Sequence, residues 1–461
     1  MHNLFSCIIF RETQAMTNQL KSISGTFERG HQGYEAARRA SVWNARLPDR
    51  FPDIIVQASD VNDVVAAVRQ AKARKLKLTV RSGGHSWAAN HVRDGGLLLD
   101  VSRLDAIQVD KKAMRATVGP GRSGHELAAK LGGIGLFFPS GHCRGVAVGG
   151  YLLQGGYGWH SRTLGPACMS VLGIDVVTAE GEILHISETE NADLFWAARG
   201  AGPGFFAVAT RFHVRLYKRP RIIGFATQSF PIDKLEQVFR WAHAIGPSVS
   251  PAVELQLILT RHAPGVRGTG IMVFAPVFAD SLGEALKALA FLNKSPLNRQ
   301  TTWRVPFIPS GLSLMYHEIG RHYPDNYRYA VDNMWTHAGI EDLLPSLKRI
   351  AETLPPAPSH ALWLNWMPPK TRPAMAYSIE DDIYLALYGV WKQAKDDAKI
   401  ALWPEQRLRE MEHLASGCQL ADENLGQRPA RFVIETNMKK LDQLRALHDP
   451  QSRFQPWMGR P

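Results

Sequence analysis

Two short stretches carry side chains that can form covalent bonds with an electrophile. His85 lies in the segment RSGGHSW, and Cys143 lies in SGHCRG. Imidazole and thiolate are both nucleophiles, although a lone loop histidine is commonly structural and a lone cysteine is commonly a small buried residue. The neighbours of Cys143, His142 and Arg144, can carry positive charge and favour its thiolate. The pair therefore points to an electrophilic cofactor with one attachment to each side chain.

Glycines surround both side chains. Seven of the eighteen residues from Gly141 to Gly158 are glycine, and further glycine-rich stretches are Gly83-Gly84 and RGAGPGFF at 199–206. Such density permits tight turns, and it also lets backbone N–H groups approach a phosphate-bearing cofactor closely. Three glycine-rich loops in one region favour the second explanation, because they can form three walls around a long ligand.

Another glycine motif is a weaker signal. Gly119, Gly121 and Gly124 form G-x-G-x-x-G between a predicted strand and a predicted helix, as in dinucleotide-binding sites. Pro120 removes an N–H group from this loop, and no acidic residue ends a strand about 20 residues later, where the ribose partner is expected. We therefore interpret the motif as a plain strand-to-helix turn.

These loops require a scaffold of alternating strands and helices. Valines recur at helical spacing after a cap at Ser59 or Asp60, which predicts a helix there. The pattern is typical of a βαβ-rich α/β region. The other predicted elements of the first half are strands at 54–57, 78–80, 97–99, 116–118 and 206–216, helices at 125–131 and 191–200, and a hairpin of 174–178 with 182–186.

The pattern changes after YKRPR, and the second half is richer in aromatic residues. In DDIYLALYGVW, period-two alternation places Ile383, Leu385 and Leu387 on one face of a strand and Tyr384 and Tyr388 on the other. This half predicts an α+β substrate domain. Its other predicted elements are strands at 253–259 and 270–277 and a helix at 282–292.

Length and composition exclude several classes of protein. At about 100–200 residues per domain, 461 residues suggest two or three domains. The contents of hydrophobic (45%) and charged (21%) residues are typical of globular chains. The net charge of +12 comes from scattered basic residues without interleaved aromatics, so we expect no nucleic-acid partner. No window approaches about 18 consecutive apolar residues, so we expect no membrane span.

Cysteine usage favours a reducing compartment. The four cysteines are widely spaced and form no C-x-x-C motif, so we expect neither a disulfide framework nor a metal site. The first residues show no basic segment and no cleavage site of a secretory signal, which favours a cytoplasmic location. Met16 is an alternative start, in which case residues 1–15, with Cys7, are an extension.

RSGGHSW together with SGHCRGVAVGGYLLQGGYGW resembles the FAD-binding domain of the vanillyl-alcohol oxidase or p-cresol methylhydroxylase superfamily, and within it the berberine bridge enzyme-like branch. The resemblance extends through LGIDVVTAEGEIL, NADLFWAARGAGPGFF and DDIYLALYGVW to the tail LDQLRALHDPQSRFQPWMGRP, and so covers the chain from about Arg39 to the end. The paired histidine and cysteine contexts are its most specific part.

The resemblance implies an α+β fold of two domains. A p-cresol methylhydroxylase-type FAD-binding domain would be split between residues 1–218 and 428–461. It would enclose an α+β substrate domain at 219–427, with an antiparallel sheet covered by helices. The tail segment HDPQSRF would return to the FAD-binding domain.

The resemblance also implies FAD held by two covalent bonds, from His85 to the 8α-methyl carbon of the flavin and from Cys143 to C6. Two anchors hold the ring in one orientation, and histidine attachment raises the reduction potential of the flavin. The other implied cofactor contacts are Arg81, Ser82, Gly83, Gly84, Ser86, Gly141, Val146, Gly149, Gly150, Gly155, Gly156, Gly158, Gly204 and Val208.

The implied activity is that of an oxidase. A hydride passes from an alcohol, hemiacetal or similar small-molecule substrate to flavin N5, and O2 reoxidises the flavin to give H2O2. In the family, valine three residues after the cysteine resembles the oxidases and leucine the dehydrogenases, and here it is Val146. The sequence leaves the substrate and the oligomeric state open. The alternatives are a dehydrogenase with another electron acceptor and a catalytically decayed protein that tethers flavin.

Two substrate-facing positions depart from the family, so the usual catalytic base cannot be transferred. Thr163 stands where many relatives carry lysine, and Gln419 where many carry tyrosine. Tyr384 and Asp422 are the candidate bases, with Glu423 beside the second. A tyrosine base needs a pKa well below its usual value of about 10, whereas an ionised carboxylate needs no such shift. Aromatic packing against helices is the alternative role for the tyrosines.

Overall fold

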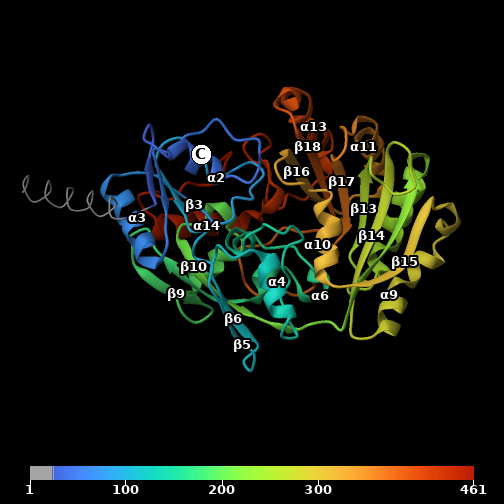
Figure 1. The fold of residues 1–461 in the computed structure, drawn as a ribbon, viewed down its shortest axis with the longest axis horizontal. Coiled ribbons are helices and arrows are strands. Elements are labelled where there is room, and N and C mark those ends of the chain that lie inside the picture. Colours follow the sequence, from blue (N-terminus) through green and yellow to red (C-terminus); the bar gives the residue numbers. More distant parts are fainter. Residues whose placement is uncertain (1–22, 24, 461) are drawn as a thin grey trace, which may run out of the picture.

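Two lobes lie side by side along the long axis of the molecule (Figure 1). The computed structural model describes residue 23 and residues 25–460. The first lobe contains the chain up to about residue 218 together with the C-terminal helix, and the second lobe contains most of the rest. The predicted extension with Met16 and Cys7 lies outside the described residues.

The first sheet of the first lobe carries the loop with His85. Its strand order is β1-β2-β4-β3, with β2 and β3 parallel to β4 and β1 antiparallel to β2. Helix α3 (Val61–Ala73) connects β2 to β3, and the side chain of its cap, Asp60, accepts from the Asp63 backbone N–H at 3.0 Å. This part confirms the predicted βαβ unit. The strands are β1 (Thr26–Glu28), β2 (Ile54–Gln57), β3 (Leu78–Arg81) and β4 (Leu97–Asp100).

The second sheet is antiparallel, with strand order β5-β6-β10-β8-β9. It confirms the predicted hairpin, now β8 with β9. Strands β9 and β10 both pair antiparallel with β8 and therefore run parallel to each other, and helix α7 (Ala192–Ala198) connects them. The predicted strand–helix–strand pattern is thus also present in this sheet, beside the tight turns from β5 to β6 and from β8 to β9. The strands are β5 (Ile107–Asp110), β6 (Arg115–Val118), β8 (Val171–Val177), β9 (Ile183–Ser187) and β10 (Val208–Arg215).

Short elements complete the first lobe. Helix α4 (Gly124–Gly132) begins with a capping box in which Ser123 and Glu126 exchange hydrogen bonds. The others are α2 (Tyr34–Ala40), α5 (Val148–Leu153), α6 (Ser161–Leu164), α7 (Ala192–Ala198), and the strand pair β7 (Leu136–Phe137) with β11 (Tyr217–Lys218).

The second lobe is built on a seven-stranded antiparallel sheet of order β15-β12-β14-β13-β17-β18-β16. In strand β18 the alternation of residue types determines which side chains lie on each face of the sheet. Ile383, Leu385 and Leu387 pack with the helices, whereas Tyr384 and Tyr388 face the first lobe, as the alternation predicts. The strands are β12 (Ile222–Pro231), β13 (Leu255–Thr260), β14 (Gly270–Ala279), β15 (Trp303–Ser310), β16 (Arg328–Thr336), β17 (His360–Asn365) and β18 (Ile383–Trp391).

Helices cover the face of this sheet that lies away from the first lobe. The predicted α+β architecture with a helix-covered antiparallel sheet is therefore confirmed. The covering helices are α8 (Leu235–Ile245), α9 (Leu282–Lys294), α11 (Ile340–Thr353) and α13 (Trp403–Glu410); α10 (Leu312–Gly320) and α12 (Asp397–Ile400) lie at other edges.

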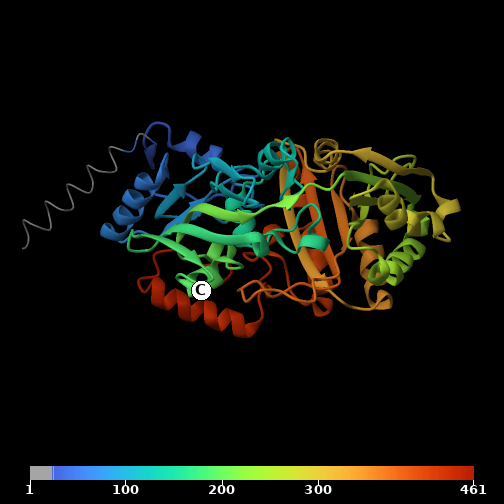
Figure 2. The same cartoon turned by 90° about the horizontal axis from the view of Figure 1, so that it is seen from below.

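The C-terminal segment returns to the first lobe as α14 (Glu435–His448), which Figure 2 shows along its lower side. After α14 the chain pairs with β3, since the Leu78 backbone N–H donates to Arg453 O at 2.7 Å and the Gln455 N–H donates to Leu78 O at 2.9 Å. Where the chain leaves the second lobe, Arg428 donates to both carboxylate oxygens of Asp332 on β16 at 2.7 Å.

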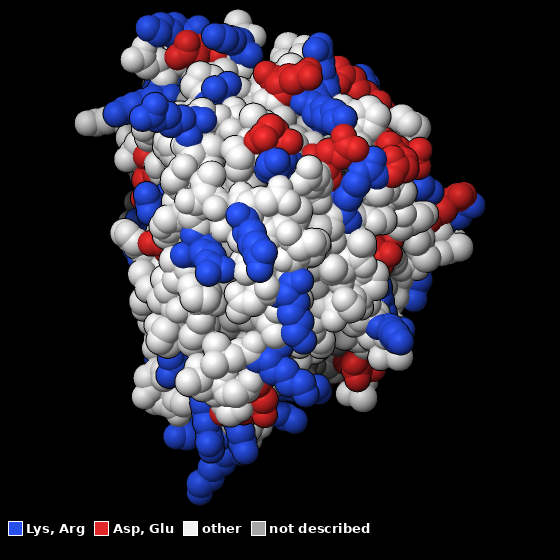
Figure 3. Space-filling model, turned by 90° about the vertical axis from the view of Figure 1, so that its right-hand side faces the viewer, with Lys and Arg blue, Asp and Glu red and all other residues white. Residues whose placement is uncertain are grey.

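Charged side chains are dispersed on the end of the second lobe seen in Figure 3. Lys and Arg are spread over this face, with Asp and Glu among them in its upper part. Within the described part of the chain, no helix has both the length and the apolar character needed to cross a bilayer.

Candidate active site and cofactor cavity

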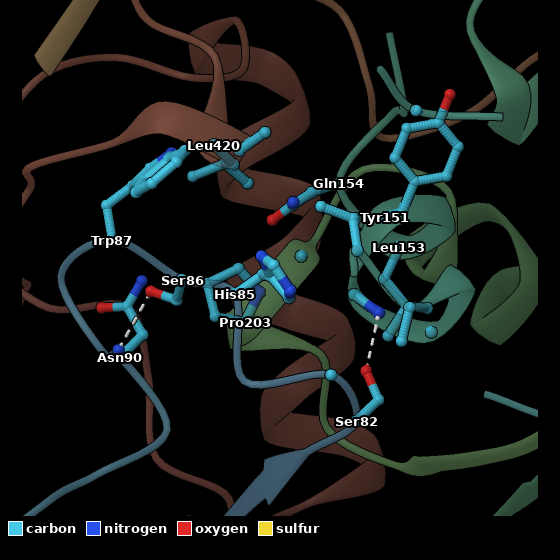
Figure 4. Close-up of a pocket in the computed structure, with 18 of the residues that line it drawn as sticks. Ser82, His85, Ser86, Trp87, Asn90, Tyr151, Leu153, Gln154, Pro203 and Leu420 are labelled. Atoms are coloured by element: carbon cyan, nitrogen blue, oxygen red, sulfur yellow. Dashed lines mark hydrogen bonds between the residues drawn. The ribbon is translucent and has the colours of Figure 1, made fainter. Parts of the chain in front are cut away.

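One long cavity runs between the two lobes. The first lobe lines it with β3 and the loop that follows and with residues between Gly141 and Tyr157. It also contributes Gly202, Pro203, Phe205, Ala207, Ala209, Phe454 and Gln455. Figure 4 shows His85 projecting into it beside Ser86 and Pro203. The second lobe lines it with Gln256, Ile319, Tyr323, Trp335, Leu362, Leu364, Tyr384, Tyr388 and residues 419–422.

His85 presents a neutral imidazole to this cavity. Burial, aided by the positive charge of Arg81, lowers the pKa of His85 to about 4, so the ring is uncharged at neutral pH. Trp43 stacks on the ring at a centroid distance of 4.7 Å and fixes its plane. Gly145 makes room for it, because a Cβ there would lie 2.3 Å from His85 Nε2. An uncharged, oriented imidazole has a lone pair available for bonding to an electrophilic carbon.

Cys143 lines the same cavity, but its thiol keeps its proton at neutral pH. Burial, with the negative charge of Asp422, raises the pKa of Cys143 to about 12. The prediction that His142 and Arg144 favour the thiolate is wrong. The His142 ring lies 2.9 Å from Glu254 Oε2, on the other lobe, and Arg144 is exposed. Bond formation at Cys143 therefore requires removal of its proton.

The glycines of the histidine loop bring three chain segments together. Gly83 lies against Ala147, where a Cβ would meet the backbone N at 2.9 Å. Gly84 has φ +71° and lies against Ser41 O, which a Cβ would meet at 2.3 Å. Ser82 Oγ accepts from the Gly150 N–H at 3.2 Å, as Figure 4 shows. These contacts hold His85 at a fixed place in the wall.

Most of the other predicted cofactor contacts also line the cavity. Arg81 is held there by an ion pair in which its Nη1 donates to both carboxylate oxygens of Asp100 at 2.9 Å. The predicted residues in the lining are His85, Cys143, Arg81, Ser82, Gly83, Gly84, Ser86, Gly141, Val146, Gly149 and Gly150.

Five predicted contacts lie behind the wall instead. A Cβ at Gly155 or Gly156 would meet an aromatic ring, of Tyr377 or Tyr151, at 2.9 Å. Close packing of the chain therefore requires glycine at both positions. Gly158 lies against Ser140 O, and Gly204 lies against Trp457. Val208, on β10, is buried in the hydrophobic core of the first lobe. The five residues outside the lining are Gly155, Gly156, Gly158, Gly204 and Val208.

The G-x-G-x-x-G motif forms a turn, as predicted. A Cβ at Gly119 would lie 2.2 Å from Leu104 O, and one at Gly121 would lie 2.0 Å from Ser102 O. Both glycines thus allow the backbone to cross the loop after β4. Pro120 between them lines the cavity.

Asp422 ends a short 3-10 turn (Leu420–Asp422) and points its carboxylate at the aromatic face of β18. Its Oδ2 accepts from Tyr384 OH at 2.5 Å and from Tyr388 OH at 2.9 Å, and its Oδ1 accepts from Trp87 Nε1 at 2.5 Å. Burial raises the pKa of Asp422, and the three hydrogen bonds oppose that rise. The two predicted candidates, Tyr384 and Asp422, are therefore one hydrogen-bonded unit.

Tyr384 acts in this unit as a hydrogen-bond donor. Burial, followed by the nearby charge of Asp422, raises the pKa of Tyr384 well above its usual value. A phenol in this environment keeps its proton and donates a hydrogen bond to the carboxylate. The adjacent Glu423 does not line the cavity, since its carboxylate bonds Asn90 and the Leu425 backbone N–H.

The two positions that depart from the family lie in different places. Gln419 lines the cavity, and its Oε1 accepts from Tyr384 OH at 3.4 Å. Thr163 is exposed outside the lining and donates to Pro251 O at 3.0 Å. Sequence reasoning missed Trp87, which binds Asp422, although Trp87 ends the RSGGHSW segment that carries His85.

The residues present fit FAD. Two nucleophilic side chains on separate loops, His85 and Cys143, face one cavity, and the imidazole of His85 is uncharged. Closely packed glycine loops form one wall of this cavity. His85 and Cys143 would hold the flavin, and the lining from β3 to Phe454 would hold the rest of the cofactor. When bound, FAD supplies hydride acceptance at this site.

Comparison with known proteins agrees with this fit. A family profile described as an FAD binding domain matches residues 52–187. The FAD-linked oxidoreductase nodO of Hypoxylon pulicicidum is 30% identical over 437 residues, which is 91% of this chain and 94% of that protein. The (R)-6-hydroxynicotine oxidase of Paenarthrobacter nicotinovorans is 35% identical over 205 residues, 44% of each chain.

Solved structures share the fold. The BBE-like 1 protein of Physcomitrella patens superposes with a TM-score of 0.83 at 18% identity, covering 97% of this chain and 99% of that one. The chain therefore belongs to the FAD-linked oxidoreductases, with the fold of the vanillyl-alcohol oxidase and p-cresol methylhydroxylase superfamily and its berberine bridge enzyme-like branch.

Proposed function

We propose that this chain is a flavin-dependent oxidase that holds FAD by two covalent bonds, through His85 and Cys143, and uses Asp422 as its catalytic base. The observation that carries the proposal is the placement of all three side chains on one cavity between the lobes. The substrate is a small molecule whose reacting carbon bears a hydroxyl or similar group, and O2 is the electron acceptor.

Asp422 removes the proton from the substrate O–H in its ionised form. Tyr384, Tyr388 and Trp87 each donate a hydrogen bond to it, so the carboxylate is held in one orientation at the cavity wall. Their donation also limits the rise in its pKa that burial causes. Tyr384 is a positioning residue in this scheme and not the base.

This hydrogen-bonded carboxylate favours an active enzyme over the alternative of a protein that only tethers flavin. This chain lacks the lysine and the tyrosine that many relatives carry at positions 163 and 419. Asp422, held by Tyr384, Tyr388 and Trp87, can serve as the catalytic base instead. The names of the relatives support an oxidase, since one of them is a hydroxynicotine oxidase. We therefore rank the tethering protein and the dehydrogenase behind the oxidase.

Covalent attachment is tested on denatured protein. Acid-precipitated holoprotein is expected to keep its yellow colour, and digestion should yield flavin peptides containing His85 and Cys143, because each side chain faces the cavity. His85→Ala and Cys143→Ala should each retain flavin by one bond, and the double variant should release it. The measurement is flavin absorbance of the pellet with peptide mass spectrometry.

A matched control is Cys168→Ala, since Cys168 is a buried thiol that does not line the cavity. It should keep both bonds. A colourless pellet from the wild-type holoprotein would refute covalent attachment.

Oxygen reactivity is tested at Val146, which lines the cavity. Leucine is one methylene longer than valine and would leave less room in the cavity wall for the approach of O2. Val146→Leu should therefore slow reoxidation of the reduced enzyme, while anaerobic reduction by substrate stays near the parent rate. Stopped-flow absorbance and H2O2 yield measure the two steps. Reoxidation at the parent rate would show that Val146 does not control oxygen access.

A further inference from the structure

Three side chains outside the cavity converge on the open face of the five-stranded sheet. Asp175 on β8 lies between His185 on β9 and His213 on β10. Asp175 Oδ1 is 2.8 Å from His185 Nδ1 and 3.0 Å from His213 Nε2. All three are half-buried, and none lines the cofactor cavity.

The register of the sheet brings these groups together. Asp175 is paired directly with His185, and Gly173, two residues earlier on β8, is paired with His213. Directly paired residues point to the same side of a sheet, so the three side chains share one face. The two imidazole rings meet edge to face with centroids 5.1 Å apart.

Gly173 supplies the space for that meeting. A Cβ at this position would lie 2.8 Å from two atoms of the His185 ring, Cε1 and Nε2. The ring of His185 therefore leans over the bare backbone of Gly173 toward His213. Any side chain there would push the ring away from its two partners.

We propose that Asp175, His185 and His213 form a binding site for a divalent transition metal, with Zn²⁺ as its natural probe. One ligand atom from each residue lies within 4.8 Å of the others. Zn²⁺ binds histidine nitrogen and carboxylate oxygen at about 2.0–2.2 Å, so a small outward movement of the rings admits the ion in place of the shared protons. Two imidazoles and one carboxylate form a three-ligand set, and the open sheet face leaves a fourth position for water.

One neighbouring charge opposes the metal. Arg211 Nη1 lies 3.8 Å from Asp175 Oδ2, the carboxylate oxygen that the histidines leave free. The guanidinium would repel a divalent cation, so it should weaken binding without contributing a ligand. Arg211→Gln is therefore expected to tighten binding, which a merely structural hydrogen-bond network would not do.

The test is calorimetric titration of tag-free holoprotein with ZnSO4. We expect one binding event, which Asp175→Asn, His185→Gln and His213→Gln each weaken by at least about tenfold, since even changes behind the ligands cost about 10–100-fold. Gly173→Ala should weaken it as well. Zn²⁺ should also raise the thermal midpoint of the wild type more than that of the variants.

His317→Gln is the matched control, because His317 is an exposed histidine of the second lobe outside this cluster. It should bind Zn²⁺ as the wild type does. Flavin absorbance and turnover should be unchanged in every variant, since the cluster lies outside the cavity. Absence of binding to the wild type, or equal binding by the wild type and the ligand variants, would overturn the proposal and leave an ion-paired network only.

Discussion

Replacing Asp422 by asparagine is expected to lower the rate of substrate-dependent flavin reduction by about 10²–10⁴-fold, which is the usual contribution of a general base. Asparagine keeps the size of the side chain and can still accept from the phenols, but it cannot take a proton. The measurement is anaerobic stopped-flow absorbance of the holoenzyme. Reduction of Asp422→Asn at the parent rate would mean that the base lies elsewhere.

The pH dependence sharpens this test. Burial raises the pKa of Asp422, so the reduction rate should rise with pH as the carboxylate ionises, above the range of an exposed aspartate. Tyr384→Phe removes a donor that lowers this pKa, and the rise should then move to higher pH with most of the plateau retained. If Tyr384 were the base, the plateau itself would fall by about 10²–10⁴-fold.

Glu423→Gln is the matched control for the carboxylate. Glu423 is adjacent to Asp422 and buried, but its Oε2 accepts from the Leu425 backbone N–H at 2.6 Å instead of facing the cavity. Its substitution should leave the reduction rate near that of the parent. Equal losses in both variants would point to a general disturbance of this segment.

Arg428→Met is expected to lower the free energy of unfolding by about 3–5 kcal/mol, because it leaves the Asp332 carboxylate buried without its partner. The two side chains are 2% and 1% exposed. Burial opposes the charge of Arg428, but the hydrogen bonds and the charge of Asp332, together with other nearby negative charges, outweigh burial and raise the pKa of Arg428. Arg428 also donates to Asn333 O at 2.7 Å. Urea unfolding followed by fluorescence measures the loss.

The double variant Arg428→Met/Asp332→Asn separates the pair from its packing. Removal of both charges should recover a large part of the stability, since a buried ion pair is often near neutral against uncharged replacements. Lys439→Met is the control, because the Lys439–Glu435 pair is 71% and 78% exposed and should contribute at most about 1 kcal/mol. A loss no greater than that of Lys439→Met would contradict the expected role of Arg428.

The features that depend only on neighbouring residues could be predicted from the sequence. Alternation in β18 placed Tyr384 and Tyr388 on one face, and that face lines the cavity. The segments around His85 and Cys143 carried the family resemblance. These inferences need only neighbouring residues, so no knowledge of the tertiary fold was required.

Other features depend on contacts between distant segments. Asp422 meets Trp87 from 335 residues away. The pKa of Cys143 is raised by burial and by the charge of the distant Asp422, so its protonation could not be inferred from its sequence neighbours. Gly155 and Gly156 look like cofactor-loop glycines in sequence but pack under Tyr377 and Tyr151. No sequence motif marks the cluster of Asp175, His185 and His213, because the three residues are brought together only by the pairing of β8 with β9 and β10.

The pairing of β3 with residues 453–455 orders events during synthesis. Strand β3 leads directly into the loop with His85, and its partner, with the cavity residues Phe454 and Gln455, follows the whole second lobe in the sequence and is synthesised after it. Domains generally fold as their residues emerge, from the N-terminal end onward. The first lobe instead combines segments that precede and follow the second lobe, so its part of the cavity is completed only after translation of the whole second lobe.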